Sequence, residues 1–384
     1  MKKSLSVACL SLGLLWPVSA LTNDFDQFRQ QQQQAFGQFT QDFDQAFAAY
    51  QQAFATAFAA YQEELRTQWR EPLISDQHRW IEYSADQRSR SVVDFEANQV
   101  TIEVEPEAGQ SGVEAAMALL IDVLERPIEE AYARDEVTQR AVQAAQLPQE
   151  SLGASGRKRV LEGVGPEHAE AMLNQAQVQR TTQPAATGGT REVVMLTVPL
   201  PEARTSDRAR EFMPLIERYA REYQLEPALM LAIMHSESSF NPMARSHIPA
   251  FGLMQIVPQS AGRDVSQELY GQQRVFSPSY LYNAENNIRA GAIYLNILNT
   301  RYLRHIEHPE SRMYAVIAAY NTGAGNVART FTGGPRSVPQ AARVINAMPP
   351  QEVYQQLSRQ LPYQETRDYL DKVTSRTLAY RQFN

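Results

Sequence analysis

The chain has 384 residues, of which 43% are apolar and 21% are charged, and its formal net charge is −7. This length allows two or three domains of ordinary size, with enough residues for at least one substantial core. The composition excludes a wholly disordered chain and a polytopic membrane protein. The acidic balance provides no general electrostatic surface for nucleic acid, so we expect no nucleic-acid partner.

Residues 1–20 predict a secretory signal peptide. Lys2 and Lys3 precede a short apolar run, and residues 18–20 resemble a signal cleavage site. An uncleaved membrane anchor is the alternative, although the run is short for a bilayer span. Cys9 comes before most of the run, which is the wrong place for a lipidation cysteine. It is also the only cysteine, so the mature chain should contain no disulfide.

Residues 21–72 predict one long amphipathic helix that ends before Pro72. Its aromatic side chains recur at an average spacing of about 3.6 residues, the period of one helix face; they are Phe36, Phe39, Phe43, Phe47, Tyr50, Phe54, Phe58 and Tyr61. Such a stripe needs a partner. We expect it to pack on the chain itself or on a second copy. Membrane-surface contact is the alternative, although the polar face carries Gln and Asp instead of Lys and Arg.

Residues 73–200 predict a small α+β domain. Alternating apolar and polar residues are typical of half-buried strands, and they occur at 79–83, 91–95, 99–104 and 192–198. A turn is expected at 96–98. The remaining segments predict helices over 113–146 and near 157–178, and a loop or linker over 181–190.

Residues 201–384 predict an all-α domain. Pro, Gly and Asn separate the apolar-periodic segments, and we expect helices over 206–223, 227–238, 286–303, 312–320 and 364–380.

The helix expected over 227–238 carries the clearest chemical signal. Residues 228–234 are all apolar, so this helix should be buried almost all round, and Pro242 prevents it from continuing. Glu237 is therefore a carboxyl at the end of an apolar helix, where burial disfavours the charged form and raises the pKa. A protonated Glu near neutral pH can act as a general acid. The ordinary alternative is a helix-end Glu paired with a nearby arginine.

Two further stretches add to this signal. Gly252 precedes an apolar–polar–apolar run that would suit a cleft wall. A glycine-bearing turn after the helix over 312–320 would expose Tyr320 and Asn321. Each stretch taken alone is typical of an ordinary helix end or loop.

Together these motifs resemble the lysozyme-like domain of the bacterial lytic transglycosylases related to the soluble enzyme. The matches follow the family's order: Glu237–Pro242, Ala244, Ser246, Gly252–Gln255, Pro258, Asn287, Ile288, Gly291, Ala319–Val327, Leu361–Tyr363, Glu365–Tyr369 and Val373. This resemblance implies a mainly α, lysozyme-like domain over 201–384.

The strand region resembles the N-terminal domain of a membrane-bound lipoprotein of that family, through Trp80, Tyr83, Ser89-Arg90 and Val93–Glu96. The expected fold class is thus an α+β N-terminal domain followed by a mainly α, lysozyme-like C-terminal domain. Two features depart from the family. The signal lacks a well-placed lipidation cysteine, and Pro249 stands where the family usually has glycine.

The resemblance implies that one glutamate, Glu237, cleaves peptidoglycan glycan strands. It would protonate the oxygen between N-acetylmuramic acid (MurNAc) and N-acetylglucosamine (GlcNAc). It would then accept the proton of the muramyl C6 hydroxyl, which attacks C1 and leaves a 1,6-anhydro end without water. Ser246 would orient Glu237, and Tyr320 would hydrogen-bond near the scissile bond or to Glu237.

The resemblance also implies sugar-binding roles for Met254, Gln255, Asn321 and Glu365. An ion pair with Arg367 or another base is the alternative for Glu365. We expect no metal and no cofactor. The implied partner is the glycan strand, with self-association or membrane-surface contact through 24–70 left open. The implied location is the periplasm, with association with the outer membrane also left open.

Two rival functions remain at this point. A hydrolytic muramidase on the same fold would need a second carboxylate to position water, and Asp264 or Glu365 could supply it. The other rival is a non-catalytic cell-wall-binding scaffold, which has no need of an acid at Glu237.

Overall fold

The computed structural model describes residues 19–184, 189–201 and 204–382, and within these ranges it describes side chains from residue 43 onward except those of residues 184 and 204. The chain divides into two compact units, Met1–Gln45 and Ala46–Asn384. Cys9 and most of the predicted signal peptide lie outside the described residues. None of the described helices is both long and apolar enough to cross a membrane.

Helix α1 runs unbroken from Ser19 to Arg66, as the aromatic period predicts. In the second unit, the aromatic side chains of Phe47, Tyr50 and Phe54 are buried. Tyr50 and Phe54 belong to the hydrophobic core of this unit. The prediction that the stripe packs on the chain itself is therefore confirmed for this part of the helix, whereas the side chains of 21–42 lie outside the described part.

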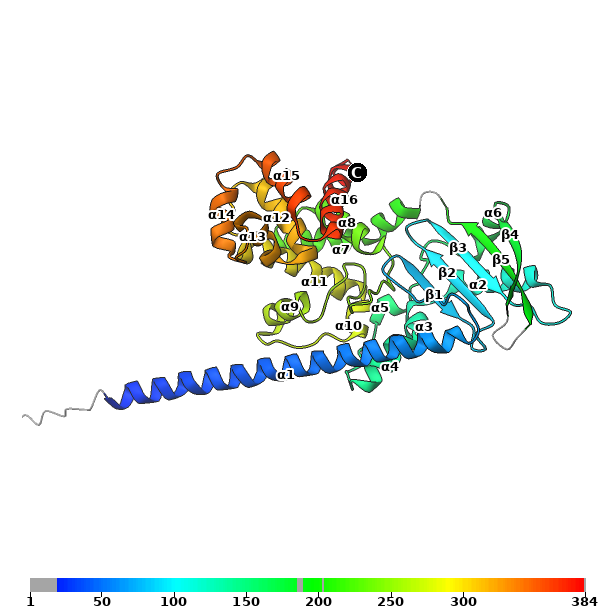
Figure 1. Ribbon diagram of the computed structural model, residues 1–384, viewed down its shortest axis with the longest axis horizontal. Helices are drawn as coiled ribbons and strands as arrows, with labels where there is room; N and C mark the ends of the chain where they lie inside the picture. Colours follow the sequence, from blue (N-terminus) through cyan, green and yellow to red (C-terminus); the bar gives the residue numbers. More distant parts are fainter. Residues whose placement is uncertain (1–18, 185–188, 202–203, 383–384) are drawn as a thin grey trace, which may run out of the picture. The chain divides into compact units, whose positions relative to one another are not determined.

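A five-stranded antiparallel sheet follows α1. Its strands are β1 (Arg79–Tyr83), β2 (Ser89–Asp94), β3 (Gln99–Val104), β4 (Gln177–Pro184) and β5 (Thr190–Pro199), in the spatial order β1-β2-β3-β5-β4 (Figure 1). The expected turn joins β2 to β3, where the Asp94 carboxylate accepts hydrogen bonds from the backbone N–H groups of Glu96 and Ala97 at 3.0 and 2.7 Å. The four predicted strands are confirmed.

The helical prediction for 113–146 is confirmed, as three helices that Pro127 and Asp135 separate: α2 (Gly112–Glu125), α3 (Ile128–Ala133) and α4 (Glu136–Ala144). Two other predictions for this region were wrong in detail. The segment near 157–178 has no long helix; the short pieces are α5 (Gly153–Gly156), the 3₁₀ turn η1 (Pro166–His168) and α6 (Ala169–Leu173). Residues 181–184 are part of β4, because Thr181 and Thr182 pair with Val193 and Glu192 of β5.

The rest of the chain is helical. The five predicted helices are α7 (Arg204–Tyr223), α8 (Pro227–Ser238), α11 (Ala284–Ile297) with the π turn η2 (Leu298–Tyr302), α12 (Pro309–Thr322) and α16 (Gln364–Arg381). The sequence analysis missed α9 (Ala261–Tyr270), α10 (Pro278–Tyr282), α13 (Ala324–Thr332), α14 (Val338–Ile345) and α15 (Pro350–Gln360). The apolar helix α8 packs between α7 and α16.

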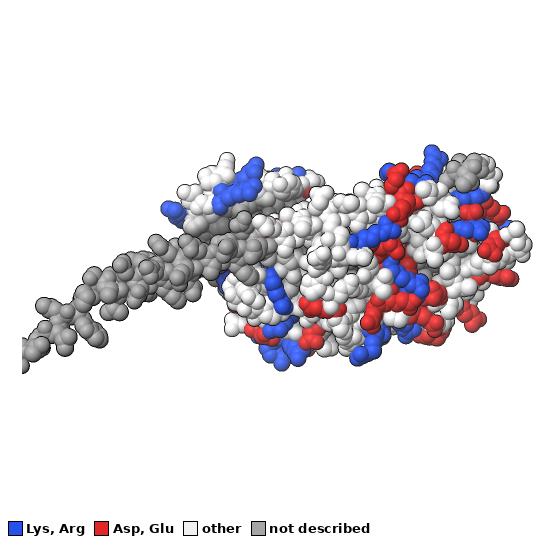
Figure 2. Space-filling view, turned by 90° about the horizontal axis from the view of Figure 1, so that it is seen from below, with Lys and Arg blue, Asp and Glu red and all other residues white. Residues whose placement is uncertain are grey.

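Charges on the second unit lie next to charges of opposite sign. Arg140 bonds both carboxylate oxygens of Glu64 at 2.6 and 2.9 Å, and Arg66 pairs with Glu63 at 3.0 Å. On the right of the face shown in Figure 2, blue and red side chains are accordingly interleaved. This part of the surface therefore carries no extended patch of one sign.

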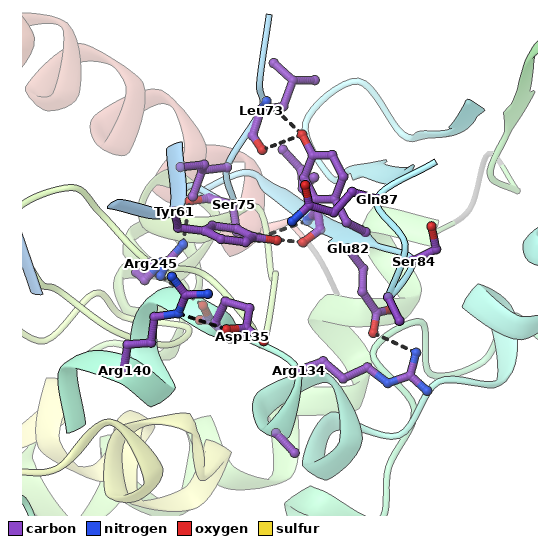
Figure 3. A pocket seen from close by; sticks show the side chains of 16 residues that line it. Tyr61, Leu73, Ser75, Glu82, Ser84, Gln87, Arg134, Asp135, Arg140 and Arg245 are labelled. Atoms are coloured by element: carbon purple, nitrogen blue, oxygen red, sulfur yellow. Dashed lines mark hydrogen bonds and ion pairs between the residues drawn. The ribbon is translucent and has the colours of Figure 1, made fainter. Parts of the chain in front are cut away.

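A buried arginine joins the helical region to the segments around the sheet. The Arg245 guanidinium bonds the Asp135 carboxylate at 3.0 Å, the Thr138 hydroxyl at 3.3 Å and the Ser75 carbonyl at 3.4 Å (Figure 3). The hydrophobic core of residues 46–384 is continuous across this junction. The domain boundaries at residues 72 and 200 stay predictions.

Arg245→Met should lower the free energy of unfolding by about 3–5 kcal/mol, because it leaves the largely buried Asp135 carboxylate without its cation. Arg66→Met is the matched control, since Arg66 and Glu63 are 54% and 73% exposed, and it should cost less than about 1 kcal/mol. Urea denaturation measures both. Equal losses would contradict the role assigned to Arg245.

Candidate active site

Glu237 lies in the last turn of α8. The helix interior is apolar, with Met230 to Met234 at most 1% exposed. It stops because Ser239 and Phe240 adopt left-handed backbone angles, φ 50° and 63°. This geometry leaves Glu237 only 8% exposed, at the point where the buried helix reaches a cleft.

Burial raises the pKa of Glu237 to about 8, and the negative charge of Glu365 contributes to the increase. The neighbouring Tyr369 hydroxyl acts in the opposite direction, because it favours the carboxylate. Arg376, a nearby cation, donates to the Ser236 hydroxyl at 2.9 Å. No arginine pairs with Glu237 among the described residues, so the ion-pair alternative was wrong and Glu237 is largely protonated at neutral pH.

Glu237 and most of the other predicted site residues line one cleft. Its volume is about 520 Å³, within the usual range for ligand sites. The predicted residues along it are Glu237, Ser246, Gln255, Tyr320, Asn321 and Glu365. A hollow of about 220 Å³ shares Gln255, Tyr320 and Asn321 with the cleft and extends to Tyr294.

Tyr320 is a fixed donor on the cleft wall. Its hydroxyl donates to the Met254 carbonyl at 2.8 Å. Burial, and next the charge of Glu237, raise the pKa of Tyr320 well above the ordinary value. Tyr320 therefore keeps its proton and links its helix to the loop that carries Met254.

The sugar-binding role of Met254 stays a prediction, but its side chain does not line the cleft. The side chain is fully buried and packs against Gly291, where a Cβ atom would collide with its sulfur. The backbone N–H of Met254 donates to the Asn287 Oδ1 atom at 2.7 Å. Met254 thus supports the site through its backbone carbonyl, which holds Tyr320.

Gln255 brings an unpaired acceptor to the cleft. Its backbone is left-handed, with φ 46°, and its Nε2 donates to the Gly252 carbonyl at 2.9 Å. Its Oε1 is buried and has no hydrogen-bond partner in the described structure. Gly252 itself has φ 73° and lies so close to Asn287 and the Leu281 carbonyl that a side chain would not fit.

Asn321 and Glu365 lie on the same side of the cleft. Asn321 Oδ1 accepts a hydrogen bond from the Thr366 hydroxyl at 2.7 Å, which orients the amide. The expected alternative for Glu365 was wrong, because Arg367 bonds Gln364 and the Leu361 carbonyl instead.

Ser246 and Asp264 are placed differently from the expectation. The Ser246 hydroxyl donates to the Ile248 carbonyl and accepts from the Ala250 N–H at 3.2 Å. It therefore bonds within its own loop, and its orienting role toward Glu237 stays a prediction. Asp264 accepts a hydrogen bond from the Tyr302 hydroxyl at 3.0 Å and is not among the residues that line the cleft.

The sequence analysis assigned no role to several residues in or beside the cleft. Tyr369 follows Glu365 by four residues on α16, and this helical spacing could have identified it. Its buried hydroxyl lies next to Glu237 and favours the carboxylate form of that residue. Tyr363 and Thr366 flank Glu365, while Gln77 comes from the segment before β1. Nothing in the local sequence pattern marks Gln77.

A second pocket of about 550 Å³ lies beside β1, and Tyr61, Glu82, Arg134 and Arg140 line it (Figure 3). Its charges are paired with one another: Arg134 contacts Glu82 at 3.4 Å, and Arg140 contacts Glu136 at 3.0 Å. No group of three or more His, Cys, Asp or Glu residues in the described ranges could hold a metal ion. The candidate acid, Glu237, therefore lies in the other cleft and not in this pocket.

Comparison with known proteins finds a matching family model. Residues 214–336 match the model of the family described as the transglycosylase SLT domain. The 70 kDa soluble lytic transglycosylase of Escherichia coli is 25% identical, with a TM-score of 0.34, and the match covers 44% of this chain and 24% of that one.

Longer matches occur among curated proteins. A membrane-bound lytic murein transglycosylase C from Sodalis glossinidius is 45% identical over 51% of this chain and 54% of that protein. The protein of the same name from Pectobacterium atrosepticum is 36% identical over 316 residues, which are 81% of this chain and 85% of the relative. With its buried acid inside the matched domain and this coverage, the chain belongs to the family of membrane-bound lytic murein transglycosylase C.

Proposed function

We propose that this protein is a lytic murein transglycosylase in which Glu237 is the single acid/base. Its substrate is the β-1,4 bond between MurNAc and GlcNAc in peptidoglycan glycan strands. The observation that carries the proposal is the position of Glu237: a buried carboxyl with a pKa near 8 on the wall of the cleft.

Bond cleavage begins with the protonated carboxyl. Glu237 donates its proton to the glycosidic oxygen, the bond between this oxygen and C1 of MurNAc breaks, and positive charge develops on C1. Glu237 is now a carboxylate. The neighbouring Tyr369 hydroxyl favours this form, and the negative charge of Glu365 favours the developing cation.

Ring closure returns the proton. The C6 hydroxyl of the same MurNAc attacks C1, and Glu237 accepts the hydroxyl proton as the new C1–O6 bond forms. The product carries a 1,6-anhydro end, and water is not consumed. An intramolecular nucleophile has a high effective concentration, so this step needs no second carboxylate. A pKa near the working pH suits a group that is first acid and then base.

The other cleft residues are proposed to bind sugar. The unpaired Oε1 of Gln255 can accept from an acetamido N–H or a hydroxyl, and Asn321 and Glu365 can bond hydroxyl groups. Ser246 lies on the same cleft and would act on Glu237 only if its hydroxyl leaves the Ile248 carbonyl. A hydrolytic muramidase is the rival, with Glu365 as its second carboxylate, but the family favours the transglycosylase.

The proposal extends to the layout of the chain. Residues 201–384 form a lysozyme-like domain and residues 73–200 a domain of the transglycosylase C type. The signal at 1–20 directs export to the periplasm, where the protein associates with the outer membrane. Residues 24–70 are proposed for self-association or membrane-surface contact, apart from the aromatic side chains at 47, 50 and 54, which are buried.

The wild-type protein should release muropeptides with 1,6-anhydro-MurNAc ends from purified peptidoglycan, and Glu237→Gln should release none. Mass spectrometry of the products distinguishes the outcomes. Glu63→Gln is the control, because Glu63 is 73% exposed on α1, and it should match wild type. Products with hydrolysed reducing ends would identify a muramidase, and binding without release by wild type would identify a scaffold.

Activity should fall as the pH rises above about 8, because Glu237 then loses the proton that it donates. Glu365→Gln removes a charge that raises this pKa, so the fall should move to lower pH. The pH dependence of kcat/KM measures the shift, with the exposed Glu352→Gln as control. An unchanged profile would show that Glu365 does not act on Glu237.

The pH dependence of the free energy of unfolding tests the pKa of Glu237 without substrate. The folded chain keeps the Glu237 proton up to a pH of about 8, whereas a free carboxyl loses it near 4.5. The folded state therefore binds more protons within this window, and the free energy of unfolding should decrease as pH rises through it. The Glu237→Gln variant should lack this contribution, so the difference between the two urea-denaturation curves should change across the window. A constant difference would mean that Glu237 is ionised in the folded protein.

A further inference from the structure

The cleft loop Gly252–Gln255 is held at its base by Phe251. The Phe251 N–H donates to the Ile256 carbonyl at 3.2 Å, and the Ile256 N–H donates back to the Phe251 carbonyl at 3.1 Å. Within the loop, the Gln255 N–H donates to the Gly252 carbonyl at 3.0 Å. Because these bonds close the loop tightly, the position of Phe251 fixes the position of the whole loop.

This loop contacts both sides of the catalytic machinery. Its Met254 carbonyl accepts the Tyr320 hydroxyl at 2.8 Å. Its Leu253 carbonyl accepts the hydroxyl of Ser238, the residue next to Glu237, at 2.8 Å. A shift of the loop would therefore move Gln255, Tyr320 and the end of α8 relative to one another.

On its other side, Phe251 packs against helix α1. The ring centroid of Phe251 lies 6.3 Å from that of Tyr50 and 6.3 Å from that of Phe54, which it meets edge to face. Tyr282 closes the cluster at 5.6 Å. None of the four side chains is more than 1% exposed. Close packing of this kind transmits a displacement, because no space is left to absorb it.

Helix α1 also contacts Arg245, the residue that pairs with Phe251. The Arg245 guanidinium lies 5.4 Å from the centre of the Phe54 ring, and Arg245 forms an antiparallel bridge with Phe251. The Gly252 N–H donates to the Ala244 carbonyl at 2.9 Å. Phe54 therefore supports both backbone segments at the base of the loop.

We infer that the part of α1 around Tyr50 and Phe54 supports the catalytic cleft, with these two as positioning residues that hold the Gly252–Gln255 loop through Phe251. The inference rests on the proposed function for its effect on turnover. This role is distinct from contact of α1 with a membrane surface, because Tyr50 and Phe54 support the cleft wall from behind.

Another aromatic residue of α1 provides a matched control. Tyr61 packs against Tyr83 at 6.3 Å and lies under Arg140 at 5.5 Å, on the side of β1 and α4 (Figure 3). Tyr61→Leu and Phe54→Leu both replace an aromatic ring of α1 by an aliphatic side chain. Only Phe54→Leu removes a ring that touches Phe251.

The test compares Phe54→Leu with Tyr61→Leu at a temperature at which thermal unfolding shows both variants to be folded. Phe54→Leu should lower kcat by roughly 10-fold or more, because a misplacement of about 1 Å can cost as much as 100-fold, with a smaller change in KM. Tyr61→Leu should leave kcat within about twofold of wild type. In a double-mutant cycle, Phe54→Leu and Phe251→Leu should be non-additive, because the rings act through one contact.

A second comparison uses one variant that keeps the aromatic ring at position 50 and one that removes it. The Tyr50 hydroxyl has no hydrogen-bond partner in the described structure, so Tyr50→Phe should retain wild-type kcat whereas Tyr50→Leu should lower it. If the variants acted only through a general loss of stability, Tyr50→Leu and Tyr61→Leu would lower kcat alike.

A methyl signal reports the loop position without any turnover. The Met254 methyl resonance of protein labelled with ¹³C-methyl methionine should shift in Phe54→Leu and stay in place in Tyr61→Leu. Equal kinetic losses in the two variants, additivity in the cycle, or an unmoved Met254 signal would overturn the inference. Absence of activity in wild type would instead refute the proposed function, and the Met254 signal would still decide the role of α1.

Discussion

The burial of one carboxyl at the end of an apolar helix is the constraint around which the catalytic region is arranged. A charged Glu237 would need water or a cation, and α8 supplies neither, because its surroundings are apolar along most of its length. The fold accommodates the residue by keeping its proton. Protonation is thus a consequence of where α8 ends, and the chemistry follows from packing instead of from a dedicated partner residue.

The cleft wall opposite this carboxyl depends on polar contacts that apolar packing supports from behind. Tyr320, Ser238 and Gln255 meet at the backbone of one short loop. Aromatic rings from α1 and α10 pack behind that loop. The buried pair Arg245–Asp135 links the same place to α4. The mature chain is expected to contain no disulfides, so ion pairs and ring packing must stabilise this arrangement.

The acid could be found from the sequence because its environment is local. Seven apolar residues in succession and a proline after the helix are enough to place Glu237 at the buried end of α8. The role of Met254 could not be found in this way. Its neighbour Gln255 lines the cleft, whereas Met254 contributes a backbone carbonyl and packs its side chain in the core. Adjacent residues of one motif do not reveal which of them faces the cleft.

Other errors came from contacts between distant segments. Strand β4 is polar and has no alternating pattern of its own, so only its pairing with β5 makes Thr181 and Thr182 part of a strand. Gln77 reaches the cleft because the segment before β1 is fixed to the end of α8, where the Asn241 amide donates to the Gln77 carbonyl at 3.3 Å and His78 bonds Ser239 at 3.2 Å. No sequence period contains that information.

Because the pKa of Glu237 is raised, glycan binding should depend on the pH. A neutral sugar chain that fills the cleft displaces water from beside the carboxyl and penalises its charged form further. Thermodynamic linkage then requires that binding be accompanied by proton uptake whenever the free enzyme is partly ionised. With Glu237 as the proposed acid, glycan binding should therefore weaken as the pH rises through its pKa near 8, and product release in that range should be accompanied by partial release of a proton.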